Sequence, residues 1–277
     1  MTEVLVRSRL VPNIHLIRLR APGIARACRP GQFIMVMADP ESERIPLSVA
    51  DWDADEGSVT AVFQIVGTST RKLSGLAAGD RLHACAGPLG RPSEIGAFGT
   101  VLLVAGCYGL AALHPAAREL RRQGNRLILL ADVKSRPLLY WEDRYRRFCD
   151  RIVLASRDPG AAFQTYASEA VAAVAAEEGR LDRVMVSGCA YLLAAVSEAT
   201  RPLGIPTVVS LNPIMVDGTG MCGACRCSVG GSTRFACVDG PDFDGHQVDW
   251  PELFRRRAAY LEEEVRSLCR FEKESLP

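Results

Sequence analysis

The sequence lacks an excess of charge of either sign. Its 277 residues include 33 basic and 32 acidic side chains, so the formal net charge is +1. Nucleic-acid-binding proteins attract phosphates through a broad positive field, which this balance does not produce. We therefore expect no nucleic-acid partner.

Long apolar runs are also missing. No such run approaches the ~18 residues that a membrane-spanning helix needs. The first residues, Met1 to Arg7, do not have the basic and then apolar layout of a secretory signal. We expect no membrane span and a cytoplasmic location. In that reducing compartment, the ten cysteines favour metal ligation and free thiols over a disulfide framework.

Side chains for acid-base or nucleophilic catalysis do not form a recognisable set. The histidines, His15, His83, His114 and His246, are scattered, and no paired carboxylates or nucleophile-histidine pattern accompanies them. We predict no catalytic residue of this kind. The chemistry is instead expected to be carried by cofactors, for which the protein sets distance and potential.

The most informative segment reads Asp217-Gly-Thr-Gly-Met-Cys222-Gly-Ala-Cys225 and is followed by Cys237. The aspartate and the three cysteines are separated by four, two and eleven residues. This is the plant-type iron-sulfur spacing, with aspartate in the place of the first cysteine. We predict that Asp217, Cys222, Cys225 and Cys237 bind a [2Fe-2S] cluster.

Small residues in this segment support the interpretation, because they let backbone N-H groups turn toward the negatively charged sulfides. The small residues between the predicted ligands are Gly218, Gly220, Gly223 and Ala224. A hairpin is predicted over 227–235, where Gly230 and Gly231 suit a tight turn. The hairpin would bring Cys237 back from a second strand.

Other interpretations of these cysteines remain open. A structural zinc site also uses a Cys-X2-Cys knuckle, but usually with a second knuckle or a histidine pair. Buried free thiols or a disulfide explain four cysteines within sixteen residues poorly. Cys227 is an alternative fourth ligand, although the loop spacing favours Asp217.

The chain divides into four predicted parts. Residues 1–98 have short apolar runs separated by turn residues, which is typical of an antiparallel β-barrel. Residues 99–209 alternate strands with helices and predict a doubly wound parallel sheet. Residues 210–250 form the cluster module. Residues 251–277 contain a helix to about residue 270, whose Arg255–Arg257 run is interpreted as a solvated face. The fold class is therefore β plus α/β.

The strands of this scheme follow from the apolar patterns. They are expected at 4–10, 14–19, 32–37, 47–50 and 59–66 in the barrel, and at 101–105, 126–131, 152–155, 183–187 and 207–210 in the parallel sheet. The order of the parts places a two-electron carrier beside a one-electron carrier. A flavin commonly joins the two.

Several segments together resemble one known family. They lie at 44–51, 63–70, 87–90 and 210–225, and the likeness continues through 235–241 and 243–249. The chain resembles the small subunit of NADH-dependent ferredoxin:NADP+ oxidoreductase. That family stands in a group with the electron-transfer subunit of dihydroorotate dehydrogenase and the small subunit of sulfide dehydrogenase, all built like ferredoxin reductases. The likeness covers nearly the whole chain.

The resemblance implies an FAD site on the barrel. Arg44 would meet the FAD pyrophosphate, which an arginine fork suits. Pro46, Leu47 and Ser48 would line the isoalloxazine, with the Ser48 hydroxyl bonded to a ring nitrogen. The other cofactor contacts implied by the resemblance are Gln64, Ile65, Val66, Gly67, Ser69 and Thr70. An aspartate ligand of the cluster, as in Asp217, also matches this family.

The nucleotide-binding turn departs from the family pattern. The family's turn resembles Gly-Gly-Gly-X-Gly-Ile-Ala-Pro, whereas this chain reads Ala105-Gly-Cys-Tyr-Gly-Leu-Ala-Ala112. Gly106 and Gly109 remain as predicted nucleotide contacts, while the side chains of Ala105 and Cys107 are expected to crowd the ligand. Asp132 is predicted to bind a ribose diol and to favour NAD.

These sites and the resemblance together predict a subunit that moves hydride between NAD(H) and FAD and single electrons through the cluster. Lys134 and Arg136 keep NADP possible. The implied partner is a larger flavoprotein with FAD and [4Fe-4S] clusters, resembling the glutamate synthase small subunit, in a complex capable of electron bifurcation. Two alternatives remain: a noncatalytic electron-relay subunit that has lost pyridine nucleotide binding, and the electron-transfer subunit of dihydroorotate dehydrogenase.

Overall fold

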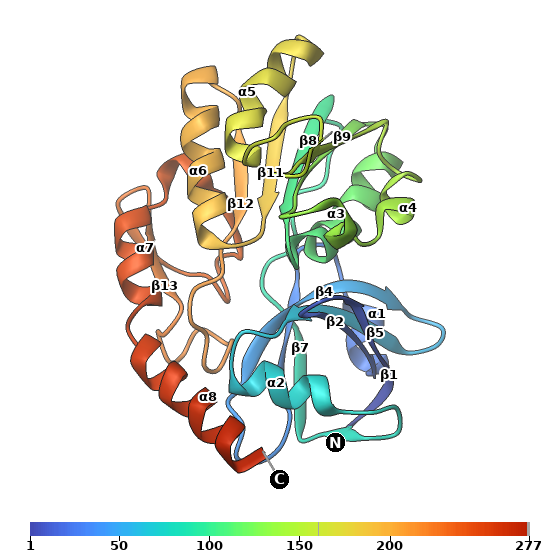
Figure 1. Ribbon diagram of the computed structural model, residues 1–277, viewed down its shortest axis with the longest axis vertical. Coiled ribbons are helices and arrows are strands. Elements are labelled where there is room, and N and C mark those ends of the chain that lie inside the picture. The colour runs from blue at the N-terminus through green and yellow to red at the C-terminus, as the bar shows by residue number, and fades with distance from the viewer. Residues whose placement is uncertain (160, 276–277) are drawn as a thin grey trace.

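The computed structural model describes residues 1–159 and 161–275 and contains a seven-stranded, a six-stranded and a two-stranded sheet (Figure 1). The two large sheets lie one above the other, and the C-terminal helices run down one side of both. The predicted β plus α/β architecture is confirmed.

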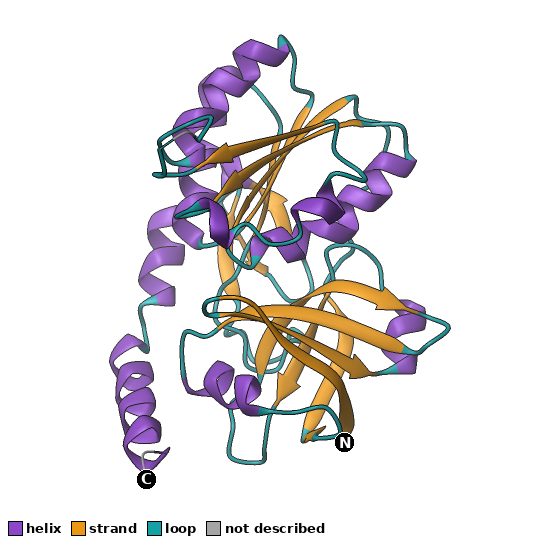
Figure 2. Ribbon diagram, turned by 45° about the vertical axis from the view of Figure 1, so that its right-hand side comes forward, coloured by secondary structure: helices purple, strands orange, loops and turns teal. Residues whose placement is uncertain are grey.

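The seven-stranded sheet is antiparallel and curves back on itself, as Figure 2 shows. Its order is β6-β1-β2-β5-β4-β3-β7. Buried residues alternate along β2 and β4 and fill the interior, which is the pattern of a half-buried strand. The strands are β1 (Thr2–Val11), β2 (Ile14–Arg20), β3 (Phe33–Met37), β4 (Ile45–Asp53), β5 (Ser58–Gln64), β6 (Arg81–Leu82) and β7 (Ala84–Leu89). The helices α1 (Pro22–Ala27) and α2 (Thr68–Gly75) belong to the same half of the molecule.

The six-stranded sheet has the order β10-β9-β8-β11-β12-β15. All neighbouring strands are parallel except β15, which is antiparallel to β12. The central strands are buried almost throughout, as expected when helices cover both faces. The strands are β8 (Thr100–Gly106), β9 (Arg126–Asp132), β10 (Arg151–Ala155), β11 (Arg183–Ser187), β12 (Thr207–Ser210) and β15 (Asp242–Asp244).

Helices cover both faces of this sheet, which confirms the doubly wound prediction. Residues of α3 pack into the core on one face, and residues of α5 and α6 pack into the core on the other. The chain order along the sheet reverses between β8 and β11, and such a switch point is where open α/β sheets bind ligands. The elements of this half are α3 (Gly109–Arg122), η1 (Arg136–Leu138), α4 (Glu142–Tyr145), α5 (Ala167–Glu178), α6 (Ala190–Thr200) and η2 (Arg201–Leu203).

The predicted cluster hairpin is present as β13 (Arg226–Val229) and β14 (Ser232–Phe235). Its turn residues, Gly230 and Gly231, both have positive φ, at 60° and 73°. The segment then returns to the parallel sheet as β15, followed by η3 (Gly245–Gln247). The cluster segment therefore packs on the nucleotide half through a shared sheet.

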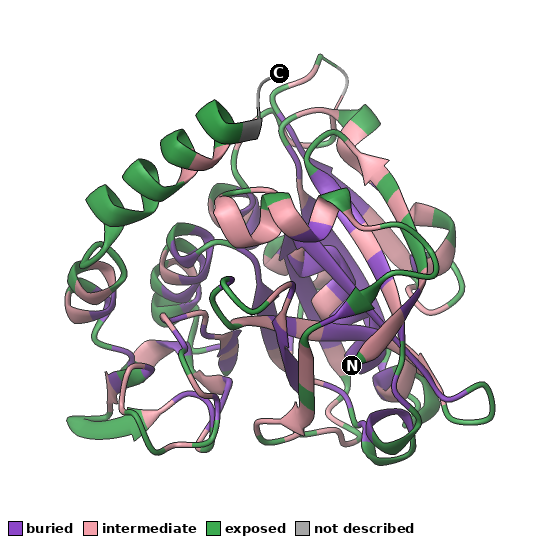
Figure 3. Ribbon diagram, turned by 90° about the horizontal axis from the view of Figure 1, so that it is seen from below, coloured by how far each residue is buried: buried purple, intermediate pink, exposed green. Residues whose placement is uncertain are grey.

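The C-terminal helix differs from the prediction. Instead of one helix to about residue 270, the structure has α7 (Trp250–Arg257) and α8 (Leu261–Ser275). The first packs Trp250 and Leu253 into the core, whereas the second turns away and follows the barrel half beside α2. Figure 3 shows that most of this second helix is exposed. Among the described residues, no helix is long and apolar enough to cross a membrane.

Candidate functional site

A cavity of about 280 Å³ lies where the barrel, the parallel sheet and the cluster segment meet. Its wall is mainly apolar, with a few hydroxyl and amide groups, which is the usual character of a cofactor site. The barrel contributes Phe33, Ile45, Pro46, Leu47, Ser48, Val62, Phe63, Gln64, Val66 and Thr70. The other two regions contribute Tyr108, Ser187, Ser210, Leu211, Asn212, Met215 and Pro241.

The structure brings six of the predicted FAD residues together in this one wall. They come from the adjacent strands β4 and β5, from the turn after β5 and from the start of α2. The six are Pro46, Leu47, Ser48, Gln64, Val66 and Thr70.

The remaining predicted FAD residues lie outside the cavity wall. Arg44 is exposed immediately before β4 and has no side-chain hydrogen bond or ion pair to any residue that the structure describes. Its guanidinium is therefore available to an anionic ligand. Ile65 donates its backbone N-H to the carbonyl of Asn13 at 2.9 Å. Gly67 and Ser69 form the first turn of α2.

The Thr70 hydroxyl organises the start of α2. It accepts hydrogen bonds from the backbone N-H groups of Val66, at 3.0 Å, and Gly67, at 3.1 Å, and donates to the Gly67 carbonyl at 2.9 Å. The Gly67 amide and this hydroxyl are thereby engaged within the turn. The first-turn amides, including that of Ser69, have no carbonyl partner within the helix and can face an anion.

Tyr108 and Asn212 are cavity residues that the sequence analysis did not assign. Asn212 Nδ2 donates to Tyr108 Oη at 2.6 Å and to the Gly188 carbonyl at 2.9 Å, and Tyr108 Oη donates to the same carbonyl at 2.9 Å. The nucleotide turn, the end of β11 and the cluster segment are thus linked at the cavity. Asn212 lies within the 210–225 segment that carries the resemblance, and this resemblance is the only sequence feature that points to the residue.

The nucleotide turn connects β8 to α3 at the switch point. Gly106 ends β8, and Gly109 starts α3. A Cβ at Gly109 would lie 2.0 Å from the Ser187 carbonyl oxygen, so only glycine fits there. Cys107 has φ of 49°, a left-handed conformation that is uncommon outside glycine, and its side chain is exposed. Ala105 is fully buried in the core, so the expectation that it crowds a ligand is wrong.

Asp132 lies beside Gly106, because the two residues are register partners at the carboxyl ends of β9 and β8. Burial raises the pKa of the Asp132 carboxyl, while a hydrogen bond from the Ala167 N-H, at 3.3 Å, acts in the opposite direction. The predicted nucleotide residues Gly106, Gly109 and Asp132 therefore share one edge of the sheet.

The four predicted cluster ligands lie on two segments: Asp217, Cys222 and Cys225 in the loop before β13, and Cys237 just after β14. Cys225 Sγ and Cys237 Sγ are 3.2 Å apart, and both side chains are buried. Asp217 Oδ2 accepts the backbone N-H of Cys222 at 2.8 Å. Among the described residues, no three ligand-type side chains converge as they would on a single metal ion. One carboxylate and three thiols at this spacing suit a diiron core better than a tetrahedral zinc ion.

The predicted ligands Cys237 and Asp217 differ in how readily they lose a proton. Burial, together with the neighbouring Cys225 thiol, raises the pKa of Cys237 to about 12, so a metal must displace the proton for this thiol to become a ligand. Hydrogen bonds from Thr219 and Cys222 lower the pKa of the Asp217 carboxyl. The carboxylate is consequently ionised and already oriented by the loop.

Glycines at positive φ shape this loop. Gly218, Gly220 and Gly223 have φ of 79°, 86° and 69°. A Cβ at Gly218 would lie 2.7 Å from Met35 Cγ, which ties the loop closely to the barrel. The residues present are thus compatible with an iron-sulfur cluster at the surface of the barrel.

Cys227 is positioned as a strand residue. It lies on β13, is 1% exposed, and its thiol contacts the Arg234 carbonyl across the hairpin at 3.7 Å. Burial raises its pKa to about 12. Cys227 and Cys225 belong to the same hydrophobic core, but the Cys227 thiol contacts the backbone across the hairpin.

The interpretation of Arg255–Arg257 as a solvated face is wrong for Arg256, which is half-buried, and it misses the hydrogen bonds that Arg256 and the exposed Arg257 both make. Arg256 donates to the carbonyls of Arg226, at 3.0 Å, and Ala224, at 3.1 Å. Arg257 donates to Asn212, at 2.8 Å to the side-chain oxygen. Helix α7 therefore supports the backbone of the cluster segment, and only Arg255 points to solvent without such a bond among the described residues.

Residues 212–249 match the family model described as the iron-sulfur cluster binding domain of dihydroorotate dehydrogenase B. A Thermotoga maritima protein named dihydroorotate dehydrogenase B (NAD(+)), electron transfer subunit homolog, is 38% identical over 273 residues, which cover 99% of this chain and 96% of that protein. The chain belongs to the family of these electron-transfer subunits and their homologues.

Other relatives agree over the full length. An uncharacterized Clostridium beijerinckii protein is 37% identical over 281 residues, covering 99% of this chain and 95% of its own length. A chain from the structure of an NADH-dependent reduced ferredoxin-NADP oxidoreductase, solved in work on flavin-based electron bifurcation, superposes with a TM-score of 0.91 at 37% identity and covers 98% of both chains. A ferredoxin NADP+ reductase from Neisseria gonorrhoeae shares the fold, with a TM-score of 0.59 at 14% identity over 74% of this chain and 91% of its own.

Proposed function

We propose that this chain is an electron-transfer flavoprotein subunit that binds FAD, a [2Fe-2S] cluster and NAD(H). One observation carries the proposal. A single apolar cavity is lined by the barrel, by Tyr108 of the nucleotide turn and by the segment from Ser210 to Met215 that leads into the cluster loop. A cofactor in this cavity would touch all three regions at once.

FAD is the cofactor that this cavity suits. Its wall offers apolar contacts to a flat ring, with Ser48 and Gln64 as polar groups at the barrel side. Bound there, FAD would take up electrons in pairs as hydride and give them up singly. Arg44 and the first-turn amides of α2 would hold the pyrophosphate, because a free guanidinium and a helix N-terminus both favour anions.

The cluster would be held by Asp217 and Cys222 on one iron and by Cys225 and Cys237 on the other. The contact between the Cys225 and Cys237 thiols and the hydrogen bond from the Cys222 backbone N-H to the Asp217 carboxylate support this assignment. Backbone groups of the same loop are fixed by Arg256 from α7. The chain thus supplies a rigid support, which a one-electron centre needs if its surroundings are to set its potential.

NAD(H) would bind at the edge formed by Gly106, Gly109 and Asp132. A carboxylate at this position suits the ribose diol of NAD and disfavours the additional phosphate of NADP. Tyr108 would lie between this edge and the flavin cavity, since its hydroxyl is bonded to Gly188 and Asn212 and its side chain lines the cavity.

The partner would be a larger flavoprotein with FAD and [4Fe-4S] clusters. The similarity to a chain of a ferredoxin-NADP oxidoreductase supports this choice. The cluster loop also has an exposed apolar side chain beside a predicted ligand, because Met221 is 88% exposed and precedes Cys222. An apolar rim of this kind suits a protein partner that approaches the cluster.

Titration of the FAD-loaded subunit with NADH and NADPH under anaerobic conditions tests the proposed function. We expect NADH to bleach the flavin absorbance promptly and NADPH to do so only at higher concentration. Dithionite serves as the control that both centres are reducible. Bleaching by neither nucleotide, with normal reduction by dithionite, would contradict the proposal.

That contrary outcome would favour a second candidate, an electron-relay subunit without pyridine nucleotide binding. The left-handed conformation of Cys107, with its exposed side chain in the nucleotide turn, is the observation behind it. A dihydroorotate dehydrogenase partner is a separate possibility raised by the name of the Thermotoga maritima relative. Copurification followed by mass spectrometry distinguishes the two partners.

A further inference from the structure

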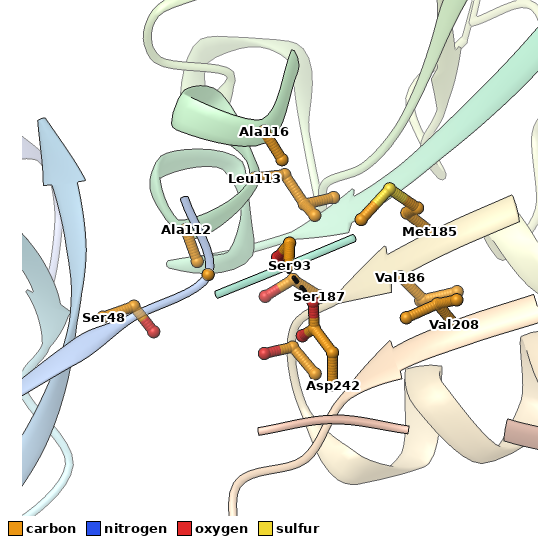
Figure 4. A pocket seen from close by; sticks show the side chains of 12 residues that line it. Ser48, Ser93, Ala112, Leu113, Ala116, Met185, Val186, Ser187, Val208 and Asp242 are labelled. Atoms are coloured by element: carbon orange, nitrogen blue, oxygen red, sulfur yellow. Dashed lines mark hydrogen bonds between the residues drawn. The ribbon is translucent and has the colours of Figure 1, made fainter. Parts of the chain in front are cut away.

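A second and much smaller cavity, whose lining residues are drawn in Figure 4, shares part of its wall with the proposed flavin cavity. Its volume is about 10 Å³, which is room for roughly one water molecule. The two cavities share three wall residues, Ser48, Ser187 and Ser210. The small cavity and the proposed flavin cavity therefore meet at these three serines.

Asp242 is the only titratable side chain among the described residues that line the small cavity. It belongs to β15 and is the register partner of Ser210 on β12. Ser93, from the loop before β8, donates its hydroxyl to Asp242 Oδ2 at 2.5 Å, and Figure 4 shows the two side chains pointing toward one another. The rest of the wall is largely apolar: Ala112, Leu113, Ala116, Met185, Val186 and Val208.

The surroundings of Asp242 disfavour its charge without pairing it directly. Burial raises the pKa of the carboxyl, and hydrogen bonds from Ser93 and Ser210 and the charge of Arg183 act against that rise. Arg183 forms an ion pair with Glu94 at 2.9 Å and lies over the Phe98 ring. The cation that acts on Asp242 is thus paired with another carboxylate, so a further charge placed nearby can still change the proton affinity of Asp242.

We propose that Asp242 is a redox-coupled proton site, which takes up a proton when negative charge enters the neighbouring flavin cavity and releases it when that charge leaves. The physical reason is Coulombic, because charges that are close together and shielded from bulk water by protein interact far more strongly than charges in water. This inference rests on the proposed function, since it needs FAD in the larger cavity.

The exchange is an acid-base step only. One proton from solvent binds a carboxylate oxygen of Asp242, and the same oxygen later loses it. Ser93 holds this carboxyl in position, and the small cavity has space and polar partners for one water that can carry the proton. Asp242 makes no covalent bond in the process and supplies no electrons.

Infrared difference spectroscopy tests the proposal on the FAD-loaded full chain with ¹³C-labelled aspartate. Dithionite reduction of the wild type is expected to produce a protonated-carboxyl band that shifts with the label, with loss of the matching carboxylate band. Asp242→Asn should lack both features. Asp244→Asn is the matched control, because this exposed carboxylate lies on the same strand outside both cavities, and it should retain them.

Proton counting gives the second readout. In weakly buffered solution with a pH indicator, the wild type should take up more protons per reduced flavin than Asp242→Asn, by up to about one, over the pH range in which the carboxyl titrates. Equal proton uptake in both proteins, or identical difference spectra, would overturn the proposal.

Ser93→Ala keeps the test decisive if the Asn variant does not fold. Loss of a hydroxyl that stabilises the carboxylate should raise the pH at which the carboxyl band is half developed. An unchanged pH would overturn the proposal. A protein that fails to bind FAD at all overturns the proposed function itself, whereas FAD binding without a difference between wild type and Asp242→Asn overturns only this inference.

Discussion

The cluster loop and the nucleotide turn both need a left-handed backbone, and they obtain it in different ways. The cluster loop uses glycine at Gly218, Gly220 and Gly223. In the nucleotide turn, Cys107 adopts a φ of 49° despite its side chain. A non-glycine residue in this region costs roughly 1–2 kcal/mol, which the surrounding structure must offset.

The difference shows where glycine is indispensable. In the nucleotide turn the strict requirement falls on Gly109, whose added Cβ would lie 2.0 Å from the Ser187 carbonyl. At Cys107 the side chain is exposed, and the Tyr140 hydroxyl holds the carbonyl of this residue at 2.9 Å. The strand-turn-helix geometry therefore survives although two glycines of the family pattern are absent.

On the cluster side of this comparison, removal of a predicted thiolate ligand should have the largest effect. Cys225→Ala should lose nearly all iron and acid-labile sulfide, because one iron loses its thiolate. Cys227→Ala is the matched control, since the two residues are 2% and 1% exposed. It should keep the cluster and lose about 1 kcal/mol of unfolding free energy. Metal and sulfide analysis of both proteins checks this, and loss of iron from Cys227→Ala alone would reverse the ligand assignment.

Gly109→Ala should remove nucleotide reactivity and destabilise the nucleotide half. The collision with the Ser187 carbonyl forces a backbone shift that costs about 1–3 kcal/mol. We expect bleaching of the flavin by NADH to be lost while dithionite still reduces both centres. Gly23→Ala is the control, because an added Cβ there meets nothing within 4 Å. Normal reduction of Gly109→Ala by NADH would show that the turn is not the nucleotide site.

Two variants of Asp217 distinguish a role as a cluster ligand from a role in supporting the loop. Asp217→Ala should weaken cluster retention and shift the cluster potential, since one iron loses an anionic ligand. The carboxylate accepts the Thr219 N-H on Oδ1 at 2.6 Å and the Cys222 N-H on Oδ2 at 2.8 Å, and Asp217→Asn keeps an oxygen acceptor for one of these two amides. We expect the Asn variant to lose iron as well during dialysis. If Asp217→Asn retains iron like the wild type while Asp217→Ala does not, the side chain supports the loop and is not a ligand of iron.

Cys107→Gly should have the smallest effect. The relief of backbone strain and the greater freedom of the unfolded chain oppose one another, so unfolding free energy should change by less than about 1 kcal/mol. Apparent NADH affinity should rise by less than about tenfold, the equivalent of 1.4 kcal/mol. Cys189→Ala, which removes another exposed thiol of this half, should leave the affinity unchanged. A fall in affinity on Cys107→Gly would assign the thiol a role in binding.

The predictable part of the molecule consists of local patterns. The strands at 183–187 and 207–210 have the expected bounds in β11 and β12, because a buried apolar run between turn residues is a sufficient signal. The spacing of the cysteines and the Gly230-Gly231 turn likewise depend on neighbours in sequence. The proposed FAD residues on β4 and β5 came from the resemblance, and the sheet then brought them into one wall.

The unpredicted part depends on contacts between distant segments. The antiparallel addition of β15 to the parallel sheet places Asp242 beside Ser210, and no local pattern specifies this register. The bonds from Arg256 to the cluster loop, and from Asn212 to Tyr108, likewise arise only when α7 and the cluster segment pack on the core. Arginine runs on a helix are usually solvated, so the sequence favoured the wrong interpretation.

The central claim is that one chain holds a diiron cluster next to a flavin, and the composition of the anaerobically purified protein tests it most directly. Iron, zinc, acid-labile sulfide and released flavin should be quantified per chain in the same preparation. We expect about two iron atoms, about two sulfides and about one FAD, with little zinc. Zinc in place of iron, or a colourless protein without acid-labile sulfide, would contradict it.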